Sequence, residues 1–237
     1  MCPTDTRSLS FREAYNMLVK PGDGPVSRHL NRHISIRISL FLVRRGAFVS
    51  PMAMTLLSFT AALAGAFLLV MGWPFLGGLM AQLASILDGC DGEIARLTGQ
   101  TSKKGGLADS VLDRVADISL VLALGILAYW AGPPPCPFLA QVLQVLSWPM
   151  ASLLLTALAL SGSLMVSYCA AITRALAPVQ LRRVVGSRDV RLFLIMLAGV
   201  ACQFYAWAAS LALALLALLT WAEVGHSLAQ APRQIEP

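Results

Sequence analysis

Long apolar runs dominate this sequence and limit the folds that it can adopt. Two of them are MTLLSFTAALAGAFLLVMGW at 54–73 and ISLVLALGILAYWAG at 118–132. Only 13% of the residues are charged, which is about half the usual fraction in soluble domains. About 20 apolar residues in a helix cross the hydrocarbon core of a bilayer, which is about 30 Å thick. The sequence therefore predicts an all-α, polytopic membrane protein.

We expect six transmembrane helices. The first four occupy, approximately, residues 51–73, 75–97, 106–130 and 145–176. The last apolar run, 192–228, is too long for one crossing, so we divide it near 202–206 into a fifth and a sixth helix. The predicted organisation is a cytoplasmic N-terminal segment (1–48), a six-helix membrane domain (49–230) and a C-terminal tail (231–237).

The segment before the first span is amphipathic. Leu30, Ile34, Ile38 and Leu42 recur every four residues, with arginines at other positions. This pattern is typical of a helix that lies in the membrane interface with its basic side toward the headgroups. A helix that caps the bundle by packing on it fits equally well. Residues 1–24 are polar and lack the apolar core of a signal peptide, so we expect them to be retained.

Positive charge is distributed unevenly between the links. Lys and Arg precede the first span, follow the sixth, and occupy the links between spans two and three and between spans four and five, whereas the other three links carry neither. By the positive-inside rule, both termini face the cytoplasm of a protein in the inner or plasma membrane. This topology accounts for the net charge of +6, and we expect no nucleic-acid partner. The five cysteines are scattered without a CxxC pair, so they indicate neither a zinc site nor a disulfide framework.

Four carboxylates in spans two and three are the strongest functional signal. Asp88 and Asp91 are three residues apart, and Asp109 and Asp113 are four apart, so each pair shares a helix face. The pairs flank one short link, which places them at similar depth on adjacent helices. Such carboxylates repel one another unless cations compensate, and oxygen ligands without His or Cys suit Mg²⁺ or Mn²⁺. We therefore expect two divalent ions at the cytoplasmic end, in a phosphoryl-transfer site.

The other polar residues of this stretch have competing interpretations. The carboxylates could instead form an ion-pair network with Arg96, Arg114 and the two lysines, although intramembrane acids usually mark function. We expect Asp117 to pair with Arg114, three residues before it. Glu93 points away from the Asp88–Asp91 face, and we expect it to lie at the surface or to contact a partner helix.

Eight of these positions together resemble a known signature. The pattern Asp88-x2-Asp91-Gly92-x2-Ala95-Arg96-x8-Gly105-x3-Asp109-x3-Asp113 is similar to that of the CDP-alcohol phosphotransferases. The resemblance implies that Asp88, Asp91 and Asp109 bind two metal ions and that Asp113 is the general base, which could also touch a metal. It further implies that CDP lies against Gly92, Ala95 and Arg96. We add Gly105, where a larger side chain would block the pocket, and Thr55 to this expected CDP site.

The resemblance also implies partners. These are a CDP-alcohol donor and a hydroxyl acceptor, the lipid bilayer, and a second copy of the chain through spans three and four. One position departs from the family: many members have Pro-Asn-x-x-Thr at the start of span one, and here Met52 replaces the asparagine. A polar contact near the donor is thereby lost, which puts donor affinity or full activity in doubt.

The segment 18–39 and the sequence SRDVRLFLI at 187–195 resemble one branch of the family, the transferase part of inositol-phosphate cytidylyltransferase/di-inositol-phosphate-phosphate synthases. That branch implies a CDP-inositol donor and an inositol-phosphate acceptor. A cationic rim would attract a phosphorylated acceptor, or would simply anchor lipid headgroups; its members are Lys103, Lys104, Arg174, Arg188 and Arg191.

Three alternatives remain open. The first is a synthase that uses CDP-diacylglycerol to make phospholipids. The second, of another class, is an ion or metal transporter with intramembrane carboxylates, although we see no internal repeat of the kind common in transporters. The third is a catalytically inactive membrane scaffold.

Overall fold

The computed structural model describes residues 9–20, 22–45, 50–135, 146–176 and 186–235, and these contain helices but no strands. The order of elements is α1 (Phe11–Leu18), a short π-helical turn (Ser27–Asn31), α2 (Arg32–Arg44), α3 (Pro51–Val70), α4 (Pro74–Leu97), α5 (Lys103–Ala131), α7 (Trp148–Leu176), α8 (Arg188–Ala201) and α9 (Ala208–Ile235). The expectation of an all-α chain is confirmed for the described residues.

Six of these helices, α3 to α5 and α7 to α9, lie where we expected spans. Three are long and apolar enough to cross a membrane by length and composition: Pro51–Val70, Trp148–Leu176 and Ala208–Gln230. The division of the last apolar run is confirmed, because α8 ends at Ala201 and α9 begins at Ala208. Helix α9 continues to Ile235, within the segment 231–237 that we expected as a tail.

Local sequence sets the helix ends near the site. The Ser50 hydroxyl accepts a hydrogen bond from the Ala53 N–H, and Pro51 occupies the first helical position of α3. The Ser102 hydroxyl accepts from the Gly105 N–H and caps α5. This cap starts α5 three residues before the expected position, so the first helical turn carries two lysines and Gly105.

Small residues allow the helices to approach closely at the end away from the charges. An added Cβ at Gly77 of α4 would lie 2.9 Å from the Gly65 carbonyl oxygen of α3. One at Gly199 of α8 would collide with the carbonyl oxygen of Pro74 at the start of α4. Glycines therefore set the spacing of α3, α4 and α8, as small residues commonly do between membrane helices.

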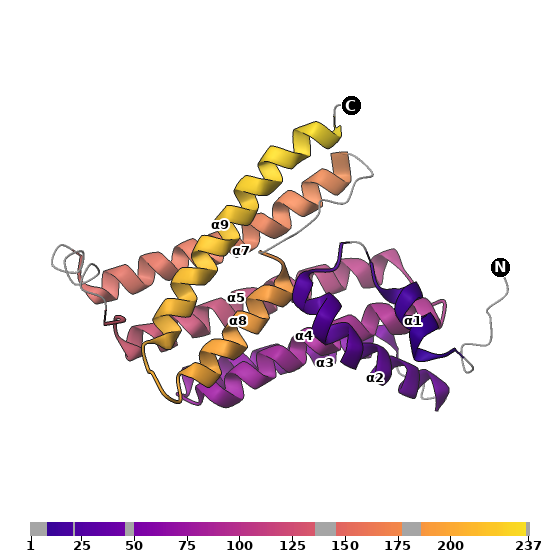
Figure 1. The fold of residues 1–237 in the computed structure, drawn as a ribbon, viewed down its shortest axis with the longest axis horizontal. Helices are drawn as coiled ribbons and strands as arrows, with labels where there is room; N and C mark the ends of the chain where they lie inside the picture. The colour runs from indigo at the N-terminus through magenta and orange to yellow at the C-terminus, as the bar shows by residue number, and fades with distance from the viewer. Residues whose placement is uncertain (1–8, 21, 46–49, 136–145, 177–185, 236–237) are drawn as a thin grey trace.

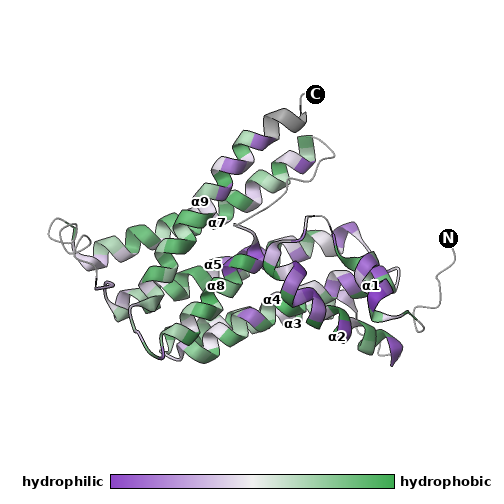
Figure 2. Ribbon diagram, viewed as in Figure 1, coloured by the Kyte–Doolittle hydropathy of each residue, from purple (hydrophilic) through white to green (hydrophobic). Residues whose placement is uncertain are grey.

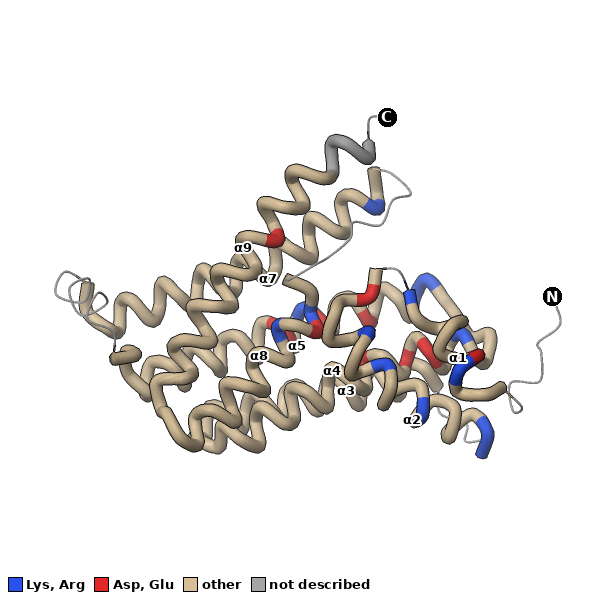
Figure 3. The backbone as a smooth tube through the Cα atoms, in the orientation of Figure 1, with Lys and Arg blue, Asp and Glu red and all other residues tan. Residues whose placement is uncertain are grey.

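The helices form an elongated bundle with chemically different ends (Figure 1). Figure 2 shows hydrophobic residues over most of the bundle. The described Lys, Arg, Asp and Glu residues gather mainly at one end of the bundle (Figure 3). There, α1 and α2 lie beside the C-terminal end of α4, the N-terminal end of α5 and the start of α8. The helices α7 and α9 run side by side, and their C-terminal ends diverge from the other helices (Figure 1).

Helix α2 is a cap on the bundle with a second, exposed face. Its buried residues, which pack toward α1 and α4, are Arg32, Ser35, Ile36, Ser39 and Leu40. Its exposed apolar residues include Ile34 and Phe41, and Leu30 is exposed in the turn before it. The packing interpretation is thus supported, and the exposed stripe remains available for the membrane interface.

Candidate active site

Three of the four expected carboxylates converge. Asp88 and Asp91 on α4 and Asp109 on α5 each offer an oxygen, and the three oxygens lie within 4.8 Å of one another. The Oδ1 atom of Asp109 is buried and has no hydrogen-bond partner among the described residues. A set of hard oxygen donors with one unsatisfied member fits a divalent cation such as Mg²⁺ or Mn²⁺.

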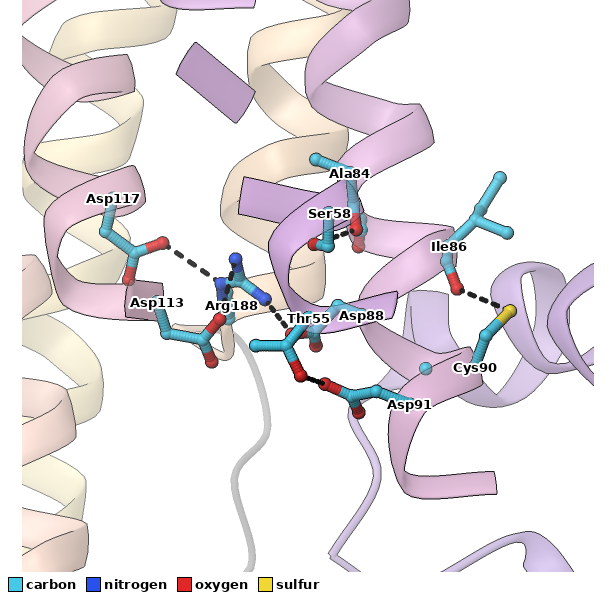
Figure 4. A network of polar contacts seen from close by, with 12 residues as sticks. Thr55, Ser58, Ala84, Ile86, Asp88, Cys90, Asp91, Asp113, Asp117 and Arg188 are labelled. Carbon is cyan, nitrogen blue, oxygen red and sulfur yellow. Dashed lines mark hydrogen bonds and ion pairs between the residues drawn. The ribbon is translucent and has the colours of Figure 1, made fainter. Parts of the chain in front are cut away.

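A neighbouring hydroxyl orients one of these carboxylates. The Thr55 hydroxyl donates a hydrogen bond of 2.7 Å to Asp91 Oδ2 (Figure 4). Both residues are buried, so the bond links α3 to α4 in an interior where it is poorly replaced by water. Thr55, which we expected at the CDP site, thus also holds an expected metal ligand in place.

Asp113 lies beside this group and contacts a cation from α8. Its Oδ1 is 3.0 Å from Arg188 Nη2, while Arg188 Nη1 is 2.6 Å from Asp88 Oδ1. Figure 4 shows Arg188 between Asp88 on one side and Asp113 and Asp117 on the other. The guanidinium therefore bridges the two carboxylate pairs. Of the two carboxylate oxygens of Asp113, only Oδ1 forms an ion pair with a described residue.

Asp117 is the centre of a buried arginine cluster. The expected pair with Arg114 is present, with 2.9 Å between Nη1 and Oδ2. Asp117 Oδ1 also lies 3.2 Å from Arg188 Nε, and Oδ2 lies 2.7 Å from Arg191 Nη2. The sequence suggested only the first partner, because the other two arginines are more than 70 residues away in the chain.

The aspartates of this region fall into two groups, according to whether they form ion pairs. Asp88, Asp113 and Asp117 pair with the three arginines of this cluster. Asp91 and Asp109 form no ion pair with a described residue. Their negative charge is the portion that a bound cation would neutralise. Of the ion-pair network that we considered from the sequence, with Arg96, Arg114 and two lysines, only the Arg114–Asp117 pair is present among the described residues.

A larger cavity, of about 740 Å³, opens between α3, α4 and the start of α5. All five residues of the expected CDP site line it: Thr55, Gly92, Ala95, Arg96 and Gly105. Met52 also lines it and is exposed there. The departure from the family pattern therefore falls on the cavity wall, where it replaces an amide by a thioether.

A smaller cavity, of about 270 Å³, lies on the other side of the carboxylates. The α1–α2 linker (residues 20 and 22–31), α4 and the start of α8 line it. Both cavities share Lys20, Asp91, Gly92, Arg96 and Asp109. They therefore meet at the candidate metal site, as two substrates that react with each other would require.

The α1–α2 linker is fastened to α4 through a buried charged trio that sequence analysis missed. Asp23 accepts two hydrogen bonds of 3.0 Å from Arg32. Arg32 Nη1 also donates to Glu93 at 2.7 Å, and Glu93 accepts from the Ser35 and Ser39 hydroxyls at 2.6 and 2.7 Å. Glu93 is 0% exposed, so the surface interpretation is wrong and the partner-helix interpretation is right, with α2 as the partner.

Opposing effects set the ionisation of Asp23 and Arg32. Burial raises the pKa of Asp23, but the hydrogen bonds from Arg32 lower it further, so the net pKa is below its usual range. Burial lowers the pKa of Arg32, and its two carboxylate partners more than compensate, so the net pKa is raised. Both groups are therefore charged at neutral pH. Arg32, Ser35 and Ser39, which follow one another at spacings of three and four residues and so share a helix face, were the available sequence signal.

A second contact fastens the linker to α8. The Ser27 N–H donates a hydrogen bond of 2.5 Å to Asp189 Oδ2. Gly24 packs so closely that an added Cβ would collide with the Asp189 carboxylate and the Ser187 hydroxyl. The linker is therefore held at both walls of the smaller cavity.

The five cations of the expected acceptor rim do not lie together. Arg188 lines the smaller cavity, and Lys104 lines the larger one. Lys103 and Arg174 are exposed and line neither of these cavities, and the Nε of Arg174 donates to the Ala170 carbonyl of its own helix. Arg191 is buried against Asp117. Of the five cations, only Arg188 and Lys104 line one of these two cavities, and their role in binding an acceptor stays a prediction.

Comparison with known proteins identifies the protein family to which this fold and site belong. Residues 48–228 match the CDP-alcohol phosphatidyltransferase family. The chain therefore belongs to that family, and the predicted enzyme class, a transferase of substituted phosphate groups, is confirmed.

Two curated relatives are similar over most of this chain. A bifunctional IPC transferase and DIPP synthase of Thermococcus kodakarensis is 40% identical over 200 residues, which cover 79% of this chain and 41% of that protein. The protein of the same name from Archaeoglobus fulgidus is 39% identical over 197 residues, which cover 78% and 35%. The chain thus spans less than half the length of these relatives.

Solved structures share the fold. The phosphatidylinositol phosphate synthase of Mycobacterium tuberculosis, solved with CDP-DAG bound, superposes with a TM-score of 0.63 at 25% identity, covering 84% of this chain and 94% of that chain. The same enzyme in complex with manganese and citrate gives a TM-score of 0.63 at 24% identity, covering 83% and 88%.

Proposed function

We propose that the chain transfers a substituted phosphate group from a CDP-alcohol to an acceptor hydroxyl and releases CMP. The observation that carries the proposal is the meeting of two cavities at three converging carboxylates. The donor occupies the larger cavity, with its nucleotide against Gly92, Ala95 and Gly105 and its diphosphate toward Arg96. Thr55 supports the donor site through Asp91.

Asp88, Asp91 and Asp109 would hold the divalent ions, which we propose to be two Mg²⁺ or Mn²⁺. Bound there, the ions would neutralise charge on the phosphoryl oxygens and improve CMP as a leaving group. Arg188 adds a fixed positive charge beside them. Because Thr55 and Arg188 restrain the carboxylates on two sides, the site is positioned before substrate binds, and this lowers the cost of reaching the reactive geometry.

Asp113 is the proposed general base. It takes the proton of the acceptor hydroxyl, whose oxygen forms a bond to the phosphorus that carries the donor alcohol. The bond from that phosphorus to the bridging oxygen breaks, and CMP leaves with this oxygen. The ion pair with Arg188 fixes Oδ1 of Asp113, which leaves Oδ2 for the proton transfer.

For substrates we propose CDP-inositol as the donor and an inositol phosphate as the acceptor. The similarity to proteins named IPC transferase and DIPP synthase supports this choice. CDP-diacylglycerol is the alternative donor, supported by the neighbour solved with CDP-DAG. The acceptor would enter the smaller, polar cavity, where Arg188 and Lys20 provide positive charge for its phosphate.

We further propose six spans, with the site and both termini in the cytoplasm, in the inner or plasma membrane. The uneven distribution of Lys and Arg supports this orientation. A homodimer through α5 and α7 is also proposed. An exposed apolar stripe on α5, which includes Leu107, Val111 and Val115, supports such a contact.

The test is CMP release by the purified chain in nanodiscs with Mn²⁺ or Mg²⁺. CDP-inositol and CDP-diacylglycerol would each be offered with inositol and with inositol phosphate. We expect release with one donor only, abolished by a chelator and restored by Mn²⁺. Asp113→Asn should reduce turnover by about 10²- to 10⁴-fold without weakening CDP binding, while Glu13→Gln, at an exposed acid on α1, should have no effect.

Two results would refute the proposal. One is CMP release that Asp113→Asn leaves unchanged. The other is metal flux through liposomes with no CMP chemistry for any donor and acceptor, which would favour the transporter.

A further inference from the structure

Two cations that form no ion pair with a described residue stand where the two cavities meet. Arg96 belongs to α4, and its Nε donates to the Gly92 carbonyl of the same helix. Lys20 follows α1, and its backbone N–H donates to Asp23. Both residues line the larger and the smaller cavity. Arg96 belongs to the signature, whereas Lys20 lies outside the residues that match the family, which begin at 48.

The two cations destabilise each other as the site stands. Burial and then the positive charge of Arg96 lower the pKa of Lys20. Arg96 is partly buried and Lys20 is exposed, and neither forms an ion pair with a described residue, so both charges are available to bind an anion. The hydroxyl oxygen of Ser187, which lines the smaller cavity, also lacks a hydrogen-bond partner among the described residues. The junction is therefore built to receive a polar, anionic ligand.

The position of Lys20 is fixed by the fold. The linker that follows it is held to α4 through Asp23, Arg32 and Glu93 and to α8 through Ser27 and Asp189. The side of the cavity that carries Lys20 is therefore anchored on both flanking helices. A lysine placed in this way keeps its ammonium near the junction at a small entropic cost.

We propose that Lys20 is a substrate-binding residue that, together with Arg96, binds a phosphate group at the junction of the two cavities. The proposal rests on the proposed function, since the phosphate is either in the donor diphosphate or in a phosphorylated acceptor. The ammonium of a lysine is a compact positive charge that suits a phosphate oxygen of either substrate. The membrane domain alone would lack this contact.

The experiment measures binding without turnover. Full-length chain in nanodiscs with Mg²⁺ would be titrated with CDP, with cytidine, and with inorganic phosphate as the probe of the acceptor side. The variants are Lys20→Gln and Lys20→Arg. Arg12→Gln is the matched control, because Arg12 is an exposed cation on α1 that lines neither cavity.

We expect Lys20→Gln to weaken one phosphate probe by about 10- to 100-fold, the range for a hydrogen bond to a charged group. Lys20→Arg should retain most of the affinity, and Arg12→Gln all of it. Weaker CDP binding with unchanged cytidine binding places the phosphate in the donor. Weaker inorganic phosphate binding with unchanged CDP binding places it in the acceptor.

Two results would overturn the proposal. One is wild-type affinity of Lys20→Gln for both CDP and phosphate. The other is an equal loss for cytidine and CDP, which would mean that the substitution acts on the structure and not on the phosphate. If no donor and acceptor yield CMP but Lys20→Gln still loses phosphate affinity selectively, the phosphate site stands and the proposed reaction fails.

Discussion

Replacing Arg32 by methionine should detach the N-terminal segment from the bundle. Arg32 of α2 contacts two carboxylates: Asp23 of the linker at 3.0 Å and Glu93 of α4 at 2.7 Å. Arg32→Met retains the volume of the side chain but leaves both acids without their partner. Glu93 is 0% exposed, so its charge cannot be solvated unless α2 moves away from α4.

The loss in free energy of unfolding depends on which charge is left unpaired. Removing one partner of a buried pair costs about 3–5 kcal/mol. Glu93→Leu should cost less, because Arg32 then still pairs with Asp23 and the two serines can bond to carbonyls of their own helix. The double variant Arg32→Met/Glu93→Leu removes the buried acid as well. We therefore expect it to be more stable than Arg32→Met alone, with a coupling of about 1–3 kcal/mol.

Hydrogen exchange read by mass spectrometry separates this local effect from global unfolding. A loss of about 3–5 kcal/mol should speed exchange in α2 by about two to four orders of magnitude, at about 1.4 kcal/mol per tenfold. Peptides from α7 and α9 serve as the internal control and should keep their rates. Additive effects of the two substitutions, or unchanged exchange in α2, would refute the idea that a buried charged trio holds this segment.

Two further predictions concern packing and the arginine cluster. Gly199→Ala should destabilise the bundle by about 1–3 kcal/mol because its Cβ meets the backbone of α4. Gly225→Ala, whose Cβ meets nothing within 4 Å, should be neutral or stabilising by up to about 1 kcal/mol. Thermal unfolding of the two variants at one scan rate tests this, and equal melting temperatures would contradict the close packing. Asp117→Asn should lower thermal stability more than Arg114→Gln does, because it leaves two buried arginines, Arg188 and Arg191, without their shared carboxylate, and the reverse order would contradict the central place of Asp117.

The sequence predicted the helices and the convergence of three carboxylates well because both depend on short-range patterns. Apolar run length located six helices, and spacing within two helices placed Asp88, Asp91 and Asp109 together. Helix starts were less accurate, as at α5, where the Ser102 cap outweighed the polar composition of the first turn.

Long-range partners could not be predicted in this way. Glu93 meets α2 across 54 to 61 residues of sequence, and no local pattern specifies the rotation of α2 about its axis. The separation of the five expected rim cations has the same cause: Arg174 lies on α7, and the side of α7 that it occupies depends on how α7 packs on α9. Arg188 was placed correctly as a cation near the site, but its role as a bridge between Asp88 and Asp113 required the tertiary structure.

The contact between Ser27 and Asp189 joins residues that are 162 positions apart. During synthesis, the linker therefore leaves the ribosome long before the helix that completes its binding surface has been made. The N-terminal segment is translated first, yet its contact with α8 can form only after α8 has been made. A nascent chain stalled before α8 would possess the carboxylates on α4 and α5 but not the closed polar cavity beside them, so the enzyme is kept incomplete until most of the bundle is in place.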